Sequence, residues 1–264
     1  MTRGHAQGEP DSAPIVVKLG GRAAAERELL ATLGAELGES FTGRAVIVHG
    51  GGAEASAWCA RVGLEPRFVD GVRMTTPEEM EMVEMVLAGK MNTAVVRTLS
   101  AAGAKAVGLS LADAALCTGE PIADPAVNRT ARPGAVDATI LEHLLAGGFT
   151  PVVSSIGSFA DGSACNINAD DAALALAVAL GAASLIFLSD IPGVLEGEDV
   201  HRELDRAGVE RLVGAGVIAG GMVAKTRSAL QAVAAGAGSV VIGEYRRGGD
   251  IAALVEGRAG TAIR

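Results

Sequence analysis

The stretch Ile15-Val16-Val17-Lys18-Leu19-Gly20-Gly21 decides the fold, because a short apolar run ends there at a lysine and two glycines. Short apolar runs bounded by glycine are typical of strands buried in a parallel sheet. Similar runs recur along the chain, each followed by a glycine or a polar turn. The six predicted strands are Ile15–Leu19, Ala45–Val48, Ala106–Leu109, Pro151–Val153, Leu185–Leu188 and Ser239–Ile242.

Helical patterns fill the segments between those runs. Thr76-Pro77-Glu78-Glu79 predicts a capping box with proline in the first turn, and apolar residues then recur at helical spacing as far as Leu99. The other predicted helices are Ala25–Leu37, Ala53–Val62, Ala138–Leu145, Asp170–Leu180 and Met222–Ala235. Alternating strands and helices predict an α/β fold around one open, mostly parallel sheet. Ala112–Pro133 is expected to form hairpins or loops beside that sheet.

Composition limits the classes of function. The 264 residues are 49% hydrophobic but only 3% aromatic, which predicts an aliphatic core in one large domain or two lobes. A formal net charge of -9 argues against a nucleic-acid partner. No apolar stretch reaches membrane length and Met1–Pro14 lacks a signal-peptide core, so we expect a cytoplasmic protein. The three dispersed cysteines show no zinc or disulfide spacing, and Cys165 is expected to be a small core residue.

Polar or glycine-rich turns follow four predicted strands and should meet at one edge of the sheet, where α/β proteins bind ligands. They are Lys18–Gly21, His49–Gly52, Ser154–Gly157 and Ser189–Gly193. Lys225, in a helix opened by Gly220-Gly221, adds a second cation. Two lysines on separate turns suit phosphoryl transfer, because the transferred group carries negative charge on several oxygens. Asp170, in the first turn of a helix capped by Asn168, could hold both lysines in place.

A different class of function is also compatible with one of these turns. Gly50-Gly51-Gly52-Ala53-Glu54-Ala55 fits the loose dinucleotide-binding pattern, with Asp70 near the position of a ribose-binding acid. This alternative, a nicotinamide or flavin enzyme, leaves the two lysines and the aspartate without a role. The sequence therefore favours phosphoryl transfer, and His49 is expected to be a hydrogen-bonded strand-end residue rather than a base.

Taken in order, these motifs resemble the amino acid kinase superfamily, and within it the members that phosphorylate N-acetylglutamate in arginine biosynthesis. The most specific pieces are VIVHGGG (Val46–Gly52), GVRMT (Gly71–Thr75), PVVSSIG (Pro151–Gly157), NINAD (Asn166–Asp170), LSDIPGVL (Leu188–Leu195) and GMVAK (Gly221–Lys225). The resemblance implies a three-layer αβα sandwich in a single amino acid kinase domain. Residues 14–175 would form a substrate-binding lobe, and residues 176–264 a nucleotide-binding lobe.

The resemblance also implies roles for individual residues. Lys18 and Lys225 would stabilise the transition state, and Asp170 would orient both. Substrate-binding positions would be Gly51, Gly52, Arg73 and Asn166, and nucleotide-binding positions Gly20, Gly21, Asp190, Ile191, Pro192, Gly193, Val194, Leu195, Val217, Ile218 and Ala219. MgATP would be the co-substrate, its metal held by ATP oxygens and water rather than by the protein. The product would be an acyl phosphate formed at the γ-carboxylate of N-acetyl-L-glutamate.

Some positions depart from the pattern of the relatives. Thr93 stands where they often carry a second lysine, and Arg22 where small polar residues are common. Met1–Pro14 has little apolar surface, so we expect no N-terminal interaction helix and predict a homodimer that arginine does not inhibit. Two alternatives remain open: a related kinase acting on carrier-linked 2-aminoadipate, and a non-catalytic nucleotide or amino-acid sensor.

Overall fold

The computed structural model describes residues 13–20, 23–24, 26–69 and 72–264. Several predictions concern residues outside these ranges. These residues are the N-terminal segment 1–12, Gly21 (predicted to bind the nucleotide), Arg22 (which departs from the pattern of the relatives), Ala25 (the predicted helix start) and Asp70 (the possible ribose-binding acid).

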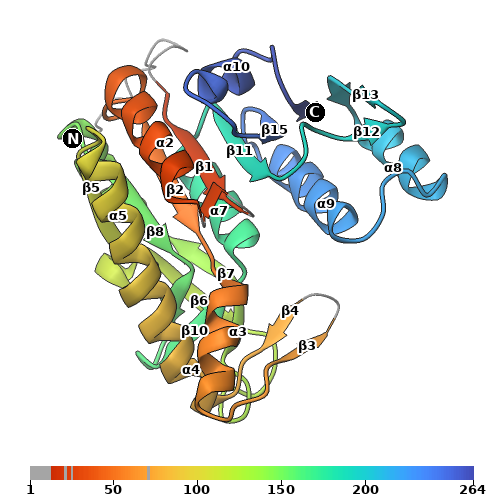
Figure 1. Cartoon of the computed structure of the whole chain (residues 1–264). Coiled ribbons are helices and arrows are strands. Elements are labelled where there is room, and N and C mark those ends of the chain that lie inside the picture. The colour runs from red at the N-terminus through yellow and green to blue at the C-terminus, as the bar shows by residue number, and fades with distance from the viewer. Residues whose placement is uncertain (1–12, 21–22, 25, 70–71) are drawn as a thin grey trace, which may run out of the picture.

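An eight-stranded sheet forms the centre of the molecule, in the order β14-β16-β15-β11-β1-β2-β8-β5 (Figure 1). The six strands from β15 to β5 are parallel, and β16 runs antiparallel to β15. The strands are β1 (Ile15–Leu19), β2 (Ala45–His49), β5 (Ala106–Ser110), β8 (Thr150–Ser154), β11 (Ser184–Ser189), β14 (Glu203–Leu204), β15 (Val240–Glu244) and β16 (Thr261–Ile263). All six predicted strands are confirmed as the parallel part of this sheet.

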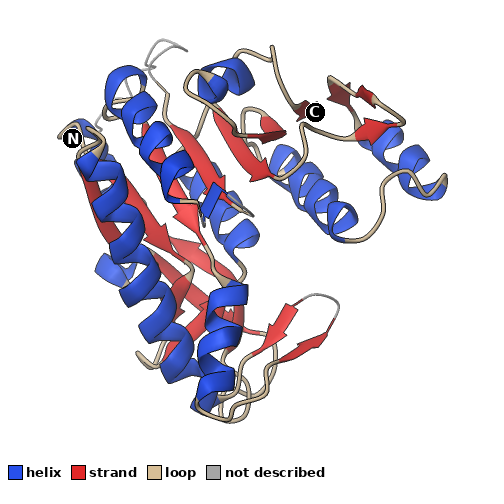
Figure 2. Cartoon of the chain, in the orientation of Figure 1, coloured by secondary structure: helices blue, strands red, loops and turns tan. Residues whose placement is uncertain are grey.

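Helices cover both faces of the sheet (Figure 2). One layer holds α2 (Arg27–Ser40), α5 (Asn92–Ala101) and α10 (Asp250–Val255); the other holds α6 (Thr139–Ala146), α7 (Ala169–Ala179) and α9 (Gly221–Ala234), with α8 (Arg206–Gly214) beside α9. Strand side chains alternate between these layers, as strand geometry requires. Val16 packs in the cluster with α6, α7 and α9, whereas Ile15 and Val17 pack in the cluster with α2, α5 and α10. The predicted three-layer αβα sandwich is confirmed.

The long helix predicted after Thr76 is present in three parts, which are α4 (Pro77–Glu84), the π-helical segment η1 (Met85–Met91) and α5. The capping box is confirmed, because Thr76 Oγ1 accepts from the backbone N of Glu79 at 3.2 Å and Glu79 Oε2 accepts from the backbone N of Thr76 at 2.8 Å. Helix α3 (Gly52–Arg61) packs against α4 and η1 in a separate buried cluster. The π-helical turn, α8 and α10 were not predicted.

Smaller elements lie around the main sheet. A small barrel is formed by β6 (Cys117–Pro121), β7 (Thr130–Val136), β9 (Ile156–Ser158) and β10 (Ala164–Ile167). Two further strand pairs are β3 (Arg67–Val69) with β4 (Val72–Met74) and β12 (Leu195–Glu196) with β13 (Asp199–Val200). A single 3₁₀ turn, η2, spans Asp113–Ala115. The hairpin expected in Ala112–Pro133 is confirmed as β6 and β7, although its closure with β9 and β10 was not foreseen. Within the described ranges, no helix combines the length and apolar character needed to cross a membrane.

Candidate active site

The four turns predicted to meet at one edge do so. They follow β1, β2, β8 and β11, and these strands are neighbours in the order β11-β1-β2-β8. Because the four strands are parallel, their carboxyl ends reach the same edge of the sheet. The candidate site is built there.

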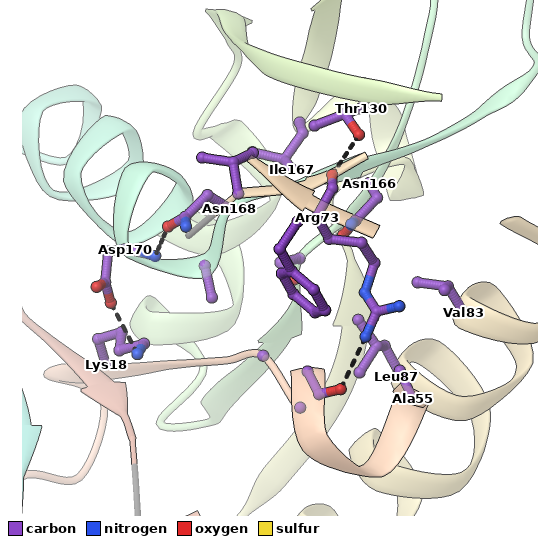
Figure 3. Close-up of a pocket in the computed structure, with 17 residues that line it drawn as sticks. Lys18, Ala55, Arg73, Val83, Leu87, Thr130, Asn166, Ile167, Asn168 and Asp170 are labelled. Atoms are coloured by element: carbon purple, nitrogen blue, oxygen red, sulfur yellow. Dashed lines mark hydrogen bonds and ion pairs between the residues drawn. The ribbon is translucent and has the colours of Figure 1, made fainter. Parts of the chain in front are cut away.

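An ion pair occupies the centre of this edge. Lys18 Nζ, from β1, lies 2.7 Å from Asp170 Oδ1, from the first turn of α7 (Figure 3). The predicted cap of α7 is confirmed, because Asn168 Oδ1 accepts from the backbone N of Asp170 at 2.8 Å and of Asp171 at 3.3 Å. Capping and the helix dipole hold a carboxylate at this position. The pair therefore joins a strand end to a helix start.

Arg73 reaches the edge from β4 and has a side chain only 6% exposed. Its Nη2 donates to Gly52 O at 2.9 Å and to Ser56 Oγ, and the guanidinium carbon lies 4.8 Å from the centroid of the Phe68 ring. Its Nη1 lies 3.9 Å from Glu79 Oε1 and has no hydrogen-bond partner among the described residues. The carboxylate of Glu79 offsets the buried charge, but within the described ranges the N–H donors of Nη1 lack a hydrogen-bond acceptor, which a planar anion could supply.

A chain of buried hydroxyls connects Arg73 with Asn166. Asn166 Nδ2 donates to Thr75 Oγ1 at 3.0 Å, and the backbone N of Thr75 donates to Thr130 Oγ1 at 3.0 Å. Thr130 Oγ1 donates in turn to Arg73 O at 2.6 Å. Thr75 is completely buried and Thr130 almost so. The positions of the arginine and the asparagine are therefore set by one network, which joins β4, β7 and β10.

These groups surround a cavity of about 210 Å³. Its lining comprises Lys18, Gly50, Gly51, Gly52, Ala55, Phe68, Val72, Arg73, Val83, Leu87, Thr130, Ser155, Asn166, Ile167, Asn168, Ala169 and Asp170. The structure thus brings together the four predicted substrate-binding residues with one of the two predicted lysines and the predicted aspartate. Figure 3 shows Arg73 and Asn166 on the side of the cavity away from the Lys18–Asp170 pair.

Lys225 lies outside this cavity, in α9. Its Nζ donates to Ser189 Oγ, at the end of β11, over 3.3 Å. Burial lowers the pKa of Lys225, Asp170 and Asp190 act to raise it, and the positive charge of Lys18 acts to lower it. Asp170 therefore contacts Lys18 directly and acts on Lys225 through space, and the two lysines lie near enough to repel each other.

The predicted nucleotide-binding segment 190–195 follows β11 and is anchored to β16. Val194 donates its backbone N–H to Thr261 Oγ1 at 2.8 Å, and Gly193 has a φ of 157°. A Cβ on Gly193 would lie 2.6 Å from the same Oγ1 atom, so this close approach requires glycine. The side chains of Val194 and Ile218 are buried in the core, whereas Asp190, Val217 and Ala219 are exposed. Val194 and Ile218 therefore offer a ligand only their backbone.

Sequence reasoning missed several residues of the site. Ser56, Phe68 and Thr130 all contact Arg73, yet none belongs to a motif. Ser56 stands one helical turn after Gly52, whose carbonyl also accepts its hydroxyl at 2.8 Å. The spacing of the Ser56 hydroxyl from Gly52 could have indicated this residue from the sequence. No sequence pattern indicated Thr130, because 57 residues separate it from Arg73.

Two expectations about neighbouring residues are confirmed. His49 is completely buried, and both of its ring nitrogens have hydrogen-bond partners, as expected of a strand-end residue. Cys165 is also completely buried, and burial raises the pKa of its thiol to about 12. A thiol with so high a pKa remains protonated at neutral pH, which suits its predicted place in the core.

An αβα sandwich whose sheet edge carries two lysines, an aspartate and glycine-rich turns defines a kinase that works without a Walker motif. The chain belongs to the amino acid kinase family, whose profile matches residues 13–244.

Similar proteins agree with this family assignment. The chain is 40% identical to the acetylglutamate kinase of Rubrobacter xylanophilus, over 95% of this chain and 96% of that protein. It is 44% identical to the acetylglutamate kinase of Chloroflexus aurantiacus, over 86% and 90%. A solved structure from Streptococcus mutans UA159 matches with a TM-score of 0.80 at 27% identity, over 97% of this chain and 99% of that one. N-acetylglutamate synthase from Neisseria gonorrhoeae shares the fold, with a TM-score of 0.80 at 21% identity, over 96% of this chain and 59% of that one.

Proposed function

We propose that this protein transfers the γ-phosphoryl group of ATP to the γ-carboxylate of N-acetyl-L-glutamate, a step of arginine biosynthesis. The observation that carries the proposal is the convergence of the Lys18–Asp170 ion pair, the Gly51-Gly52 turn, Arg73 and Asn166 on one cavity. Relatives about 40% identical over most of their length bear the name acetylglutamate kinase, which supports the same substrate.

The two ends of the cavity suit the two ends of an acylated dicarboxylic amino acid. The buried Nη1 of Arg73 has no hydrogen-bond acceptor in the described part of the chain and can donate to the α-carboxylate, and Asn166 offers an amide to the acyl group. Lys18 stands at the other end, where the γ-carboxylate would lie. A carboxylate is already ionised at neutral pH, so its attack on phosphorus needs no general base.

Charge stabilisation is the main task left to the protein. As the carboxylate oxygen bonds to the γ-phosphorus and the bond to the β,γ-bridging oxygen breaks, negative charge spreads over the phosphoryl oxygens. Lys18 and Lys225 would neutralise this charge from two sides, and the backbone N–H groups of Gly51 and Gly52 would donate to it. Asp170 holds Lys18 in place through its 2.7 Å contact. Magnesium enters as part of the co-substrate MgATP.

The nucleotide is assigned to the C-terminal half of the site in this proposal. Residues 176–264 would form the nucleotide-binding lobe and residues 14–175 the substrate-binding lobe. Gly20, the segment 190–195 and the segment 217–219 would line the nucleotide. A homodimer that arginine does not inhibit and a cytoplasmic location, both expected from the sequence, belong to the same proposal.

Trapping of the acyl phosphate as a hydroxamate tests the reaction. The purified protein is incubated with MgATP, hydroxylamine and one acid at a time: N-acetyl-L-glutamate, L-glutamate, L-aspartate or 2-aminoadipate. We expect ATP-dependent hydroxamate with N-acetyl-L-glutamate above all others. A preference for another acid would refute the proposed substrate, and no hydroxamate with any of them would refute kinase action on free acids.

A further inference from the structure

His49 ends β2 immediately before the glycine turn and makes a hydrogen bond through each ring nitrogen. Its Nδ1 lies 3.0 Å from Gly50 O, and its Nε2 lies 3.1 Å from Asn92 Nδ2. The same amide nitrogen lies 2.8 Å from Val152 O and 3.2 Å from Leu109 O, which are acceptors only. This end of the amide must therefore be the donor.

These contacts determine the tautomer of the ring. Asn92 Nδ2 has two N–H bonds to share among His49 Nε2, Val152 O and Leu109 O, and it cannot accept. A proton on His49 Nε2 would therefore face another donor, so Nε2 is the nitrogen without a proton. The proton of the neutral imidazole then sits on Nδ1, which donates it to Gly50 O. A ring held in this way is unsuited to act as a general base, because both nitrogens are occupied and the side chain is completely buried.

Asn92 comes from the point where the π-helical segment η1 ends and α5 begins. It is 5% exposed, and its side-chain amide contacts one residue in each of the strands β2, β5 and β8. Segment η1 also touches the glycine turn directly, since a Cβ on Gly51 would clash with Met91 Sδ and would lie 2.8 Å from Leu87 Cδ2. One irregular helical segment thus supports the turn through a polar and an apolar contact. Single π turns inside α-helices are often found at functional sites.

The glycine turn is therefore held from both ends. His49 binds the carbonyl of Gly50, and Arg73 binds the carbonyl of Gly52 at 2.9 Å. Gly51 lies between them with a φ of 156°, a conformation that side chains disfavour. Fixing both flanking carbonyls leaves little freedom to the peptide planes between them. The directions of the Gly51 and Gly52 N–H groups are set in consequence.

We infer that His49 and Asn92 are positioning residues for phosphoryl transfer, which aim the N–H donors of the glycine turn through the chain Asn92–His49–Gly50. The expected effect on kcat rests on the proposed function, whereas the hydrogen-bonded arrangement of Asn92, His49 and Gly50 does not depend on any substrate. Loss of either residue should lower kcat and leave the KM for the acyl amino acid nearly unchanged, because Arg73 and Asn166 stay in place.

Nitrogen NMR of the wild-type protein tests the geometry. The chain has four histidines, so ¹⁵N-histidine labelling gives few signals. The His49 ring is assigned by its loss in His49→Gln, or by elimination through substitution of His5, His143 and His201. We expect a neutral ring protonated at Nδ1 at pH 7.5. A ring protonated at Nε2, or a charged imidazolium, would overturn the inference.

Kinetics of substituted proteins test the catalytic consequence. Asn92→Leu removes the donor at similar volume, and we expect kcat to fall about 10-fold with less than about a 2-fold change in KM for N-acetyl-L-glutamate. His49→Asn can still donate an amide N–H to Gly50 O, so it should retain more kcat than His49→Leu. Equal kcat in these two variants, or an unchanged kcat in a folded Asn92→Leu protein, would overturn the inference.

A matched control separates positioning from a general loss of stability. Ser184 shares a 2.8 Å hydrogen bond with Ser239 at the amino ends of β11 and β15, whereas the glycine turn follows the carboxyl end of β2, at the other edge of the sheet. Ser184→Ala should lower Tm and leave kcat unchanged. If the wild-type protein forms no acyl phosphate, the proposed function fails, and the tautomer measurement still decides whether His49 is held as inferred.

Discussion

The two halves of the candidate site differ in how many side-chain contacts hold their residues in place. On the amino-acid side, Arg73 and Asn166 are held by a buried hydroxyl network, and every predicted substrate-binding residue lines one cavity. On the proposed nucleotide side, the predicted residues are Gly20 and two loop segments that contain both exposed and buried positions, and Lys225 makes a 3.3 Å side-chain hydrogen bond to Ser189. In the proposed assignment, the substrate pocket is thus held by side-chain contacts, whereas the nucleotide side is defined mostly by backbone.

This difference predicts different kinetic effects on the two sides. A side chain held in a buried network affects mainly the binding of the group that it contacts. A cation near the transferred phosphoryl group contributes mainly in the transition state. Substitutions can test that division.

The largest effect is expected from Lys225→Ala. Loss of a preorganised positive charge should lower kcat about 10²-fold or more, with a small change in the KM for N-acetyl-L-glutamate. Steady-state hydroxamate kinetics would measure both constants. Arg227→Ala is the matched control, because this arginine lies on the exposed side of the same helix. If kcat is unchanged in Lys225→Ala, this lysine takes no part in the reaction.

The next effect is expected from Arg73→Ala, on the amino-acid side. Removal of the buried guanidinium should raise the KM for N-acetyl-L-glutamate about 30-fold, in the range measured for truncated charge pairs. The KM for ATP should barely change. Arg67→Ala, on the neighbouring strand with an exposed side chain, is the control. A change only in the KM for ATP would show that Arg73 acts on the nucleotide and would contradict its assignment to the amino-acid side.

A smaller effect is expected from Thr130→Val, which keeps the side-chain volume and removes the hydroxyl. Thr75 N and Arg73 O would each lose a buried partner, so Arg73 should lose its fixed position. We expect the KM for N-acetyl-L-glutamate to rise about 5- to 10-fold, and Thr130→Ser to restore it. A fall in stability without a change in KM would show that the network supports only the fold.

The smallest effect is expected in the pH dependence of stability. Burial lowers the pKa of His49 below its ordinary value of 6.5. The unfolded chain therefore takes up a proton on this ring more readily than the folded protein as the pH falls below about 6.5. The free energy of unfolding should decrease in that range, and His49 should contribute no slope at higher pH. Urea unfolding at pH 7.5 and 5.5 should show a smaller decrease for His49→Gln, and equal decreases would contradict the prediction.

Much of the fold could be predicted from sequence because its strands are short, apolar and followed by glycine. The motif order, compared with a known family, also indicated residues that the structure places around one cavity; their role in binding the amino acid remains a prediction. Thr130 and Phe68 could not be found in this way, because they act through contacts between distant segments. The sequence also could not predict which residues of the predicted nucleotide-binding segments are exposed, because an apolar residue in a motif can either contact a ligand or pack in the core. Val194 and Ile218 serve the core.

The π-helical segment did leave a signal in the sequence. Leu87, Met91, Val95 and Leu99 recur at intervals of four residues, although an α-helix has about 3.6 residues per turn. Each step of four residues moves a side chain about 40° around such a helix, so the series would drift away from the core. The wider π turn absorbs that drift. All four side chains are at least partly buried.

The pairing of β1 with β11 has a mechanical consequence. These strands join the first half of the chain to the second, in register from Ile15 opposite Ser184 to Lys18 opposite Phe187. Glu36 forms a second connection, since it accepts from Tyr245 Oη at 3.1 Å and from the backbone N of Ala252 at 3.0 Å. The ladder that joins the two halves also sets the position of Lys18 relative to Ser189, whose hydroxyl accepts from Lys225. The spacing of the two lysines is therefore fixed by main-chain pairing, which a side-chain substitution cannot remove.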